Sequence, residues 1–264
     1  MITVVFNQKG GVGKSTITVN LAAIAARRGL RTLVVDLDPQ ANTTRYLLGE
    51  AAETAEPTLA EFFDQTLNFK LNPRSTEEFV LPTAHENLAL LAGHGALEEL
   101  QGKLESRYKI FKLREALREL AAQFDRIYID TPPALNFYTR SALIAARWCL
   151  IPYDCDEFAR RALLQLLETL EEVRADHNPE LQLAGIVVNQ FQSRATLPRQ
   201  AVDELAAQGL PILSPYLSSS VKVKESHQKS LPLVALEPGH RLAQEFAALF
   251  EAIEARTTGQ GNAA

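Results

Sequence analysis

The sequence predicts an α/β fold with a single doubly wound, mostly parallel sheet flanked by helices. Three observations predict it. Short apolar runs alternate with helical patterns along the chain, a glycine-rich loop joins the first strand to the first helix, and acidic residues close two later strands. Alternating strands and helices favour crossover connections and hence a parallel sheet. We expect one domain over residues 1–256 and a short disordered tail over residues 257–264.

The composition limits the classes of protein that need to be considered. A length of 264 residues with 46% hydrophobic residues suits one large domain with a substantial core. The formal net charge is −5, so any contact with nucleic acid must come from a local basic patch. The two cysteines, Cys149 and Cys155, form no C-x-x-C pair, which argues against a zinc site or a disulfide framework. No secretory signal and no apolar run of about 20 residues is visible, so we expect a cytoplasmic protein.

A glycine-rich loop follows the first predicted strand, residues 2–6, and precedes an alanine-rich helical run that begins at Ile17. In this context, glycines let backbone N–H groups turn inward around a phosphate, and the helix N-terminus adds positive dipole. Lys14 supplies positive charge for the β and γ phosphate oxygens, and the Ser15 hydroxyl is placed to hold Mg²⁺. The residues predicted to bind a nucleotide here are Lys9, Gly10, Gly11, Val12, Gly13, Lys14, Ser15 and Thr16.

The loop departs from the general pattern G-x-x-x-x-G-K-[ST], because Gln8 replaces its first glycine and Lys9 precedes a glycine pair. This arrangement resembles the deviant Walker A motif K-G-G-x-G-K-[ST] of the ParA/MinD family of P-loop ATPases. In that family the early lysine reaches across a dimer to the partner's nucleotide. The resemblance therefore implies ATP and Mg²⁺ as cofactors, an ATP-bound homodimer, and catalytic roles for Lys9 and Lys14.

Two acids close the second predicted strand, residues 31–36. Asp36 and Asp38 point the same way if the extended geometry persists, toward the strand ends where open parallel sheets bind ligands. The stretch resembles the D-x-D-P-Q element of ParA proteins. The resemblance implies that Asp38 positions the attacking water and that Asp36 lies near the metal.

A third acid, Asp130, ends the apolar strand over residues 126–130 and is followed by Thr131, Pro132 and Pro133. This is the pattern of a Walker B strand, whose acid holds Mg²⁺ or a water bound to it. The predicted metal set is thus Ser15, Asp36 and Asp130.

The remaining elements follow from hydrophobic periodicity, although residues 43–87 are weakly patterned. We expect a helix over residues 58–64 capped by Thr58, a strand over 88–91, two helices or one bent helix over 96–123, a strand over 148–152, a helix over 158–174, a strand over 183–189, a helix over 196–208, a short strand at 212–213 and a final helix over 239–255.

Asn189 ends the strand over residues 183–189, at the ligand edge of the sheet. In relatives, residues here and near Pro215 line the adenine pocket. An amide side chain can pair with the adenine edge, but it can equally stabilise a turn, so both roles remain open for Asn189.

ParA proteins bind DNA without sequence preference when they are dimeric with ATP, which requires several phosphate contacts at once. Arg194 and Lys222 match basic positions of that family. Arg199, Lys224 and Lys229 are added on charge and proximity in the sequence. The segment over residues 215–232 also departs from the family, because Tyr216 stands where an arginine is common and Ser226-His227 replaces Ala-Pro.

The resemblance implies an ATPase that is weak alone, is stimulated by a ParB-like or other partner, and positions a plasmid, chromosome or protein cluster on the nucleoid. One alternative is a MinD-like membrane ATPase, which requires a basic amphipathic C-terminal helix. The charges of the last predicted helix are mainly acidic, so no stable membrane association is expected. Another alternative is an ATP-binding scaffold that does not hydrolyse, against which the presence of Asp38 argues.

Overall fold

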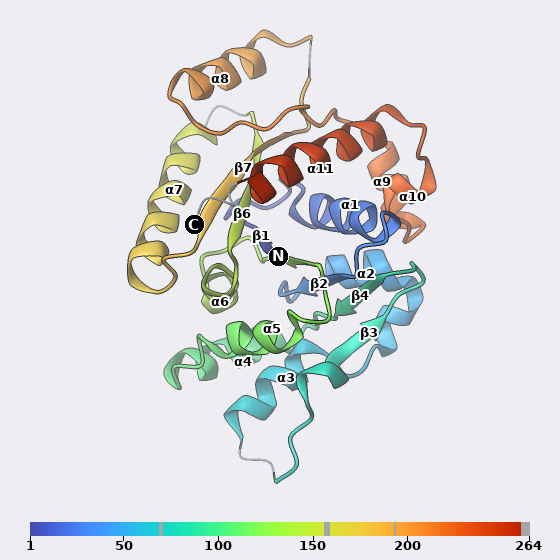
Figure 1. The fold of residues 1–264 in the computed structure, drawn as a ribbon, viewed down its shortest axis with the longest axis vertical. Helices are drawn as coiled ribbons and strands as arrows, with labels where there is room; N and C mark the ends of the chain where they lie inside the picture. The colour runs from blue at the N-terminus through green and yellow to red at the C-terminus, as the bar shows by residue number, and fades with distance from the viewer. Residues whose placement is uncertain (69–70, 156–158, 193, 260–264) are drawn as a thin grey trace.

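The computed structural model describes residues 1–68, 71–155, 159–192 and 194–259, and its sheet confirms the predicted α/β class (Figure 1). Within these residues a seven-stranded sheet runs in the order β3-β4-β2-β5-β1-β6-β7. All neighbouring strands are parallel except β3 and β4. The strands are β1 (Ile2–Val5), β2 (Thr32–Asp36), β3 (Val80–Pro82), β4 (Leu88–Leu91), β5 (Arg126–Asp130), β6 (Trp148–Asp154) and β7 (Gln182–Asn189).

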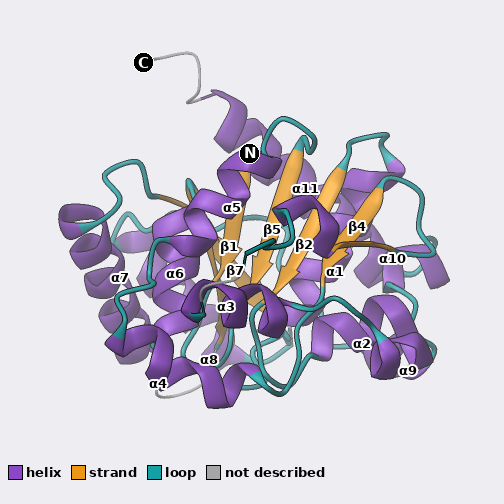
Figure 2. Ribbon diagram, turned by 90° about the horizontal axis from the view of Figure 1, so that it is seen from below, coloured by secondary structure: helices purple, strands orange, loops and turns teal. Residues whose placement is uncertain are grey.

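Helices cover both faces of the sheet, as Figure 2 shows with the strands lying between them. The α-helices are α1 (Lys14–Arg27), α2 (Asn42–Leu48), α3 (Leu59–Leu67), α4 (Leu97–Ser106), α5 (Lys112–Leu120), α6 (Phe137–Ala145), α7 (Ala159–Asp176), α8 (Thr196–Ala207), α9 (Lys222–Gln228), α10 (Leu233–Leu236) and α11 (Arg241–Gly259). Two short 3₁₀ helices lie within the described chain, η1 (Gly49–Thr54) and η2 (Thr76–Phe79). None of the described helices is long and apolar enough to cross a bilayer.

A hydrophobic core lies on each face of the sheet because successive strand residues point to opposite sides. Val4 packs with residues of α3 to α8 on one face. Val5 packs with residues of α1, α2, α10 and α11 on the other. The strand order reverses at β1, which pairs with β5 on one side and β6 on the other. Ligands of open α/β sheets bind at such a switch point, and the glycine-rich loop follows β1 directly.

The predicted elements are mostly present, with differences at their ends. The helix capped by Thr58 forms with the reciprocal Thr58–Glu61 capping box and continues to Leu67. The pattern over residues 96–123 resolves into the separate helices α4 and α5. In place of a strand at 212–213, Ile212 forms a single parallel bridge with Ile186. Strand β3 was not predicted, because its three residues in a weakly patterned segment give little periodicity. The expected start of the helix over 158–174 lies outside the described residues.

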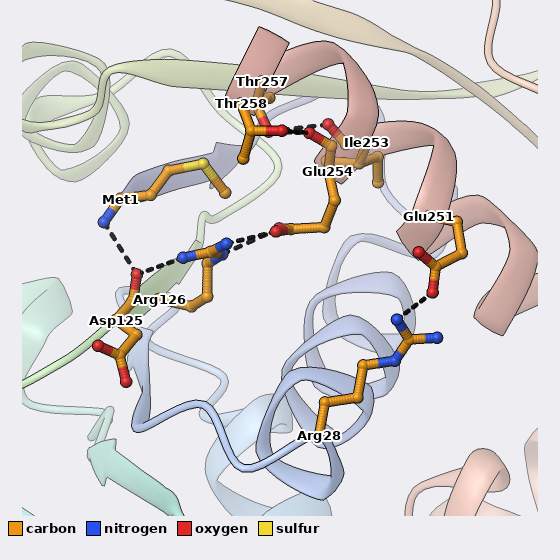
Figure 3. A network of polar contacts seen from close by, with 9 residues as sticks. All are labelled: Met1, Arg28, Asp125, Arg126, Glu251, Ile253, Glu254, Thr257 and Thr258. Atoms are coloured by element: carbon orange, nitrogen blue, oxygen red, sulfur yellow. Dashed lines mark hydrogen bonds and ion pairs between the residues drawn. The ribbon is translucent and has the colours of Figure 1, made fainter. Parts of the chain in front are cut away.

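The final helix is longer than predicted, and residues 257–259 belong to it instead of to a tail. Figure 3 shows the polar contacts that hold it. Arg126 in β5 pairs with Glu254 and also donates to the Asp125 carbonyl at 2.8 Å, which accepts the Met1 ammonium at 3.0 Å. Thr257 is buried, and its hydroxyl donates to the Ile253 carbonyl at 2.8 Å. The rest of the predicted tail, residues 260–264, lies outside the described residues.

Candidate nucleotide-binding site

The loop between β1 and α1 has a backbone that only glycine adopts readily at two positions. Gly11 has φ +75° and Gly13 has φ +90°. The Asn189 amide donates to the Val12 carbonyl at 2.8 Å, and the Gln190 amide donates to the Gly11 carbonyl at 2.9 Å. Side chains from the end of β7 therefore hold the loop in shape.

Lys14 begins α1 and lies inside the loop, with only 7% of its surface exposed. Its ammonium donates to the Lys9 carbonyl at 3.1 Å. Burial lowers the pKa of Lys14, while the nearby charges of Asp130 and Asp38 oppose that shift. The predicted phosphate lysine and two of the predicted acids are thus brought together at one point.

The Lys9 side chain is directed differently from that of Lys14. The Lys9 ammonium lies 3.3 Å from the Asp154 carboxylate at the end of β6, and 41% of the side chain is exposed. The Lys9 backbone N–H donates to the Asn7 side chain at 2.8 Å, and the Asn7 amide donates to the Pro152 carbonyl at 2.7 Å. The first part of the loop is therefore fastened to β6.

Asp130 ends β5 and is fully buried. Its Oδ2 accepts a hydrogen bond from the Thr43 hydroxyl at 2.7 Å. Its Oδ1 has no hydrogen-bond partner within the described part of the chain. Burial raises the pKa of Asp130, against the opposing effect of the Ser15 and Thr43 hydroxyls and of Lys14.

Magnesium fits this arrangement, because a hard cation prefers carboxylate and hydroxyl oxygens and usually takes few of them from the protein. The orphaned Oδ1 of Asp130 is a free buried acceptor beside Ser15 and Lys14. Ser15 and Asp130 are therefore the residues that would hold Mg²⁺, directly or through water.

Asp36 was predicted to lie near the metal, and it ends β2 directly beside Asp130. Among the described residues it accepts three hydrogen bonds. Its Oδ2 takes the Thr44 N–H at 2.8 Å and the Thr44 hydroxyl at 2.7 Å, and its Oδ1 takes the Asp38 N–H at 3.2 Å. These contacts occupy most of the carboxylate's acceptor capacity. The geometry favours Asp36 as an anchor for α2 over Asp36 as a metal ligand.

Asp38 lies beyond the end of β2, with 7% of its surface exposed. Its Oδ1 accepts the Gln40 N–H at 2.9 Å. Burial raises the pKa of Asp38, and the Gln40 N–H and the Lys14 charge oppose that effect. The Asp38 carboxylate thus lies close enough to the Lys14 ammonium for each charge to affect the pKa of the other group, and its action on water stays a prediction.

The two residues predicted to line an adenine pocket lie at the end of β7. The segment that contains Pro215 runs beside this strand, where the Leu213 N–H donates to the Ile186 carbonyl and the Leu217 N–H to the Val188 carbonyl, both at 2.9 Å. The Asn189 amide nitrogen is already engaged by Val12. The structure therefore supports a loop-holding role for Asn189.

The basic residues predicted to bind DNA fall into two groups. Arg194 and Arg199 are exposed at the start of α8, and Lys224 and Lys229 are exposed in and just after α9. Lys222 differs, because its ammonium pairs with Glu225 at 2.8 Å and Glu237 at 2.9 Å. These two carboxylates raise the pKa of Lys222 and compete with any phosphate for its charge.

Several residues of the site were missed from the sequence. Thr43 and Thr44 hold the buried acids, and Asp154 and Gln190 contact the loop. The threonine pair lies two residues after the D-x-D-P-Q stretch, and this closeness in the sequence was the available signal. Asp154 and Gln190 sit at the ends of β6 and β7, but no local pattern separates them from surface residues.

The fold and the site define a P-loop nucleotide-binding protein. A family model described as an AAA domain matches residues 1–183. The chain is 36% identical over 251 residues to the chromosome-partitioning ATPase Soj of Thermus thermophilus, covering 95% of this chain and 94% of that protein. It is 39% identical over 205 residues to the chromosome partitioning protein ParA of Myxococcus xanthus, covering 77% and 70%. The chain belongs to the ParA/MinD family of P-loop ATPases.

Solved structures agree with this assignment. A cobyrinic acid a,c-diamide synthase from Mycobacterium smegmatis with bound ADP and magnesium has a TM-score of 0.79 at 27% identity, covering 100% of this chain and 96% of that one. The ATP complex of a D38A variant of Cyanothece McdA has a TM-score of 0.83 at 23% identity, covering 97% of this chain and 96% of that one, and supports the fold alone. Structural relatives of the chain thus bind ADP or an ATP analog together with magnesium.

Proposed function

We propose that this chain is a ParA-type ATPase that binds ATP with Mg²⁺, dimerises on ATP, and then binds duplex DNA without sequence preference. Through this cycle it positions or segregates a plasmid, a chromosome or a protein cluster. The observation that carries the proposal is the meeting of Lys14, Asp38 and Asp130 at one glycine-rich loop. Relatives named as chromosome-partitioning proteins support the choice within the family.

The residues of the site divide the work of phosphoryl transfer to water. The loop N–H groups and Lys14 bind the phosphates, and Ser15 and Asp130 hold the metal. Magnesium, when bound, neutralises charge on the phosphate oxygens. Asp38 orients water and accepts its hydrogen bond, since its carboxylate stands at the loop in a largely water-excluded position. Asp38 also argues against a scaffold that binds ATP without hydrolysing it.

Lys9 is proposed to act on the nucleotide of a second copy of this chain. Its ammonium lies toward Asp154 at the end of β6, with a large exposed fraction, while the Lys14 ammonium is the one inside the loop. A dimer formed through the surface at the end of β6 would bring Lys9 to the phosphates of the partner's nucleotide. ATP hydrolysis would then depend on dimerisation. A stimulating partner protein, ParB-like or of another kind, then sets the rate.

The DNA-binding surface is proposed to combine the exposed cations of α8 and α9, namely Arg194, Arg199, Lys224 and Lys229. Lys222 can join them only by exchanging its two carboxylate partners for phosphate. A dimer doubles the number of phosphate contacts, which makes binding depend on ATP despite the net charge of −5. We propose a cytoplasmic, nucleoid-associated location for this form.

The membrane alternative receives no support from α11. Its apolar residues Leu242, Phe246 and Phe250 are buried in the core on the sheet. A helix whose apolar face is already packed has little left to insert into a bilayer. We therefore propose no stable membrane association.

Retention on non-specific duplex DNA with ATP, with ADP and without nucleotide tests the proposal. We expect retention only with ATP, falling steeply with salt. The double variant Arg194→Glu/Lys224→Glu should lose retention and keep ATP binding. Lys103→Glu/Arg118→Glu makes the same charge change on the exposed surface of α4 and α5 and should retain DNA. Retention that is independent of nucleotide, or equal loss in both double variants, would refute the assignment.

A further inference from the structure

His227, in the last turn of α9, contacts the first turn of α1, where the glycine-rich loop ends. Its Nε2 lies 3.0 Å from the hydroxyl of Thr16, the residue directly after Ser15 in α1. Sequence reasoning marked Ser226-His227 as a departure from the ParA pattern, but gave it no role. The structure shows that this departure creates a direct side-chain bond between α9 and the nucleotide site.

The His227 ring is held in place by α2. It stacks on the Tyr46 ring with centroids 4.0 Å apart and an interplanar angle of 22°. The Tyr46 hydroxyl lies 2.7 Å from the hydroxyl of Ser226, and both residues are buried. A stacked ring with a buried, bonded neighbour has little freedom to reorient, so the position of the His227 ring follows that of α2 and α9.

Helix α2 is itself joined to the acids of the site. Thr43, three residues before Tyr46, donates to Asp130. Two short routes therefore connect α9 to the nucleotide site, one through Thr16 and His227 and one through Thr43 and Tyr46. Helix α9 carries Lys222 and Lys224 and is followed by Lys229.

We propose that His227 is a positioning residue that couples nucleotide binding at the phosphate loop to the placement of α9, and hence to DNA binding. The part that concerns DNA rests on the proposed function. Physical coupling needs an interaction that the ligand changes. In the tautomer whose Nε2 accepts, a bound phosphate competes with the ring for the single Thr16 proton; in the other tautomer the hydroxyl accepts from the ring and its proton is available to the phosphate. In both cases a nucleotide phosphate acts on the same hydroxyl that His227 contacts.

The test uses amide hydrogen exchange of residues 222–230 in the full chain, with and without saturating ATP and Mg²⁺. In the unsubstituted protein we expect ATP to change exchange in this segment on the order of 5-fold or more, the lower range of allosteric couplings. His227→Phe keeps a ring for the stack on Tyr46 but removes the bond, so it should lose the response. His227→Gln keeps a polar end and should retain part of it.

His177→Ala is the matched control, since His177 lies beyond the far end of α7, at the opposite edge of the sheet from the loop, and should leave the response intact. If His227→Phe does not fold, His227→Ala replaces it with the same expected loss. The proposal would be overturned if ATP did not change the exchange of residues 222–230 in the unsubstituted protein. Equal ATP-dependent changes in exchange in the His227→Phe and His227→Gln variants would also overturn it. Failure of the unsubstituted protein to retain DNA would instead refute the proposed function, because the exchange measurement needs no DNA.

Discussion

Asp36 and Asp130 are direct partners in the parallel register between β2 and β5. Two fully buried carboxyl groups thus end neighbouring strands side by side. Burial raises the pKa of each, and the charge of Asp130 raises that of Asp36 further. The hydroxyls of Thr44 and Thr43 stabilise the charged forms in part.

Without nucleotide and metal, the free energy of unfolding is expected to fall as the pH rises above about 4, the ordinary pKa of an unfolded carboxyl. The pKa of Asp36 is raised in the folded state, so the folded protein keeps a proton that the unfolded chain loses. The free energy of unfolding therefore falls as the pH rises from the unfolded pKa to the folded pKa of this carboxyl. Urea titrations at several pH values measure the slope. Asp36→Asn, which cannot ionise, should flatten it, and an unchanged slope in that variant would contradict this explanation.

Gly13→Ala is expected to abolish nucleotide binding and to cost about 1–3 kcal/mol of stability. Gly13 has φ +90°, and an added Cβ would lie 2.3 Å from the Asn189 Nδ2, which must then release the Val12 carbonyl. Gly102→Ala in α4 is the control, since its Cβ would meet nothing within 4 Å and should stabilise the helix by about 0.5–1 kcal/mol. Urea unfolding and labelled-nucleotide binding report both effects. Normal nucleotide binding by Gly13→Ala would show that the loop adapts.

Lys9→Ala is expected to keep nucleotide binding in the monomer but to lose the ATP-dependent dimer and ATP turnover. The physical reason is that the ammonium inside the loop is that of Lys14, which donates to the Lys9 carbonyl, whereas the Lys9 ammonium is directed toward Asp154. Light scattering with ATP and a phosphate-release assay measure the two losses. Asp154→Asn removes the carboxylate charge beside Lys9 but leaves Lys9 in place, so it should still dimerise and should change stability by less than about 1 kcal/mol. An ATP dimer of normal affinity in Lys9→Ala would rule out the role across the interface.

Glu254→Ala is expected to destabilise the protein by about 2–3 kcal/mol, because it leaves the Arg126 guanidinium partly buried without its carboxylate. The two side chains are only 16% and 17% exposed (Figure 3). Glu251→Ala is the matched control on the same helix. Glu251 and its partner Arg28 are each about half exposed. The loss of stability in Glu251→Ala should therefore stay below about 1 kcal/mol. Equal urea midpoints for the two variants would show that the Arg126–Glu254 pair adds nothing.

The phosphate loop and the strand-ending acids were predictable because their signals are local. The left-handed backbone at Gly11 and Gly13 requires glycine, and Asp130 closes an apolar run of strand length. The alternation of strands and helices likewise predicted the parallel sheet. The exact end of α11 was not predictable, because residues 257–259 are held by packing and by hydrogen bonds within the helix that no periodicity marks.

The sequence by itself determined the fold class, the conformation-restricted glycines of the loop proposed to bind phosphate, and the family pattern of the acids. Tertiary structure alone decided that Asp36 anchors α2, that Lys222 is occupied by two carboxylates, and that His227 reaches Thr16. The physical reason is distance along the chain. Thr16 and His227 are 211 residues apart, so their contact exists only after the sheet order and the packing of α9 against α1 and α2 have brought them together.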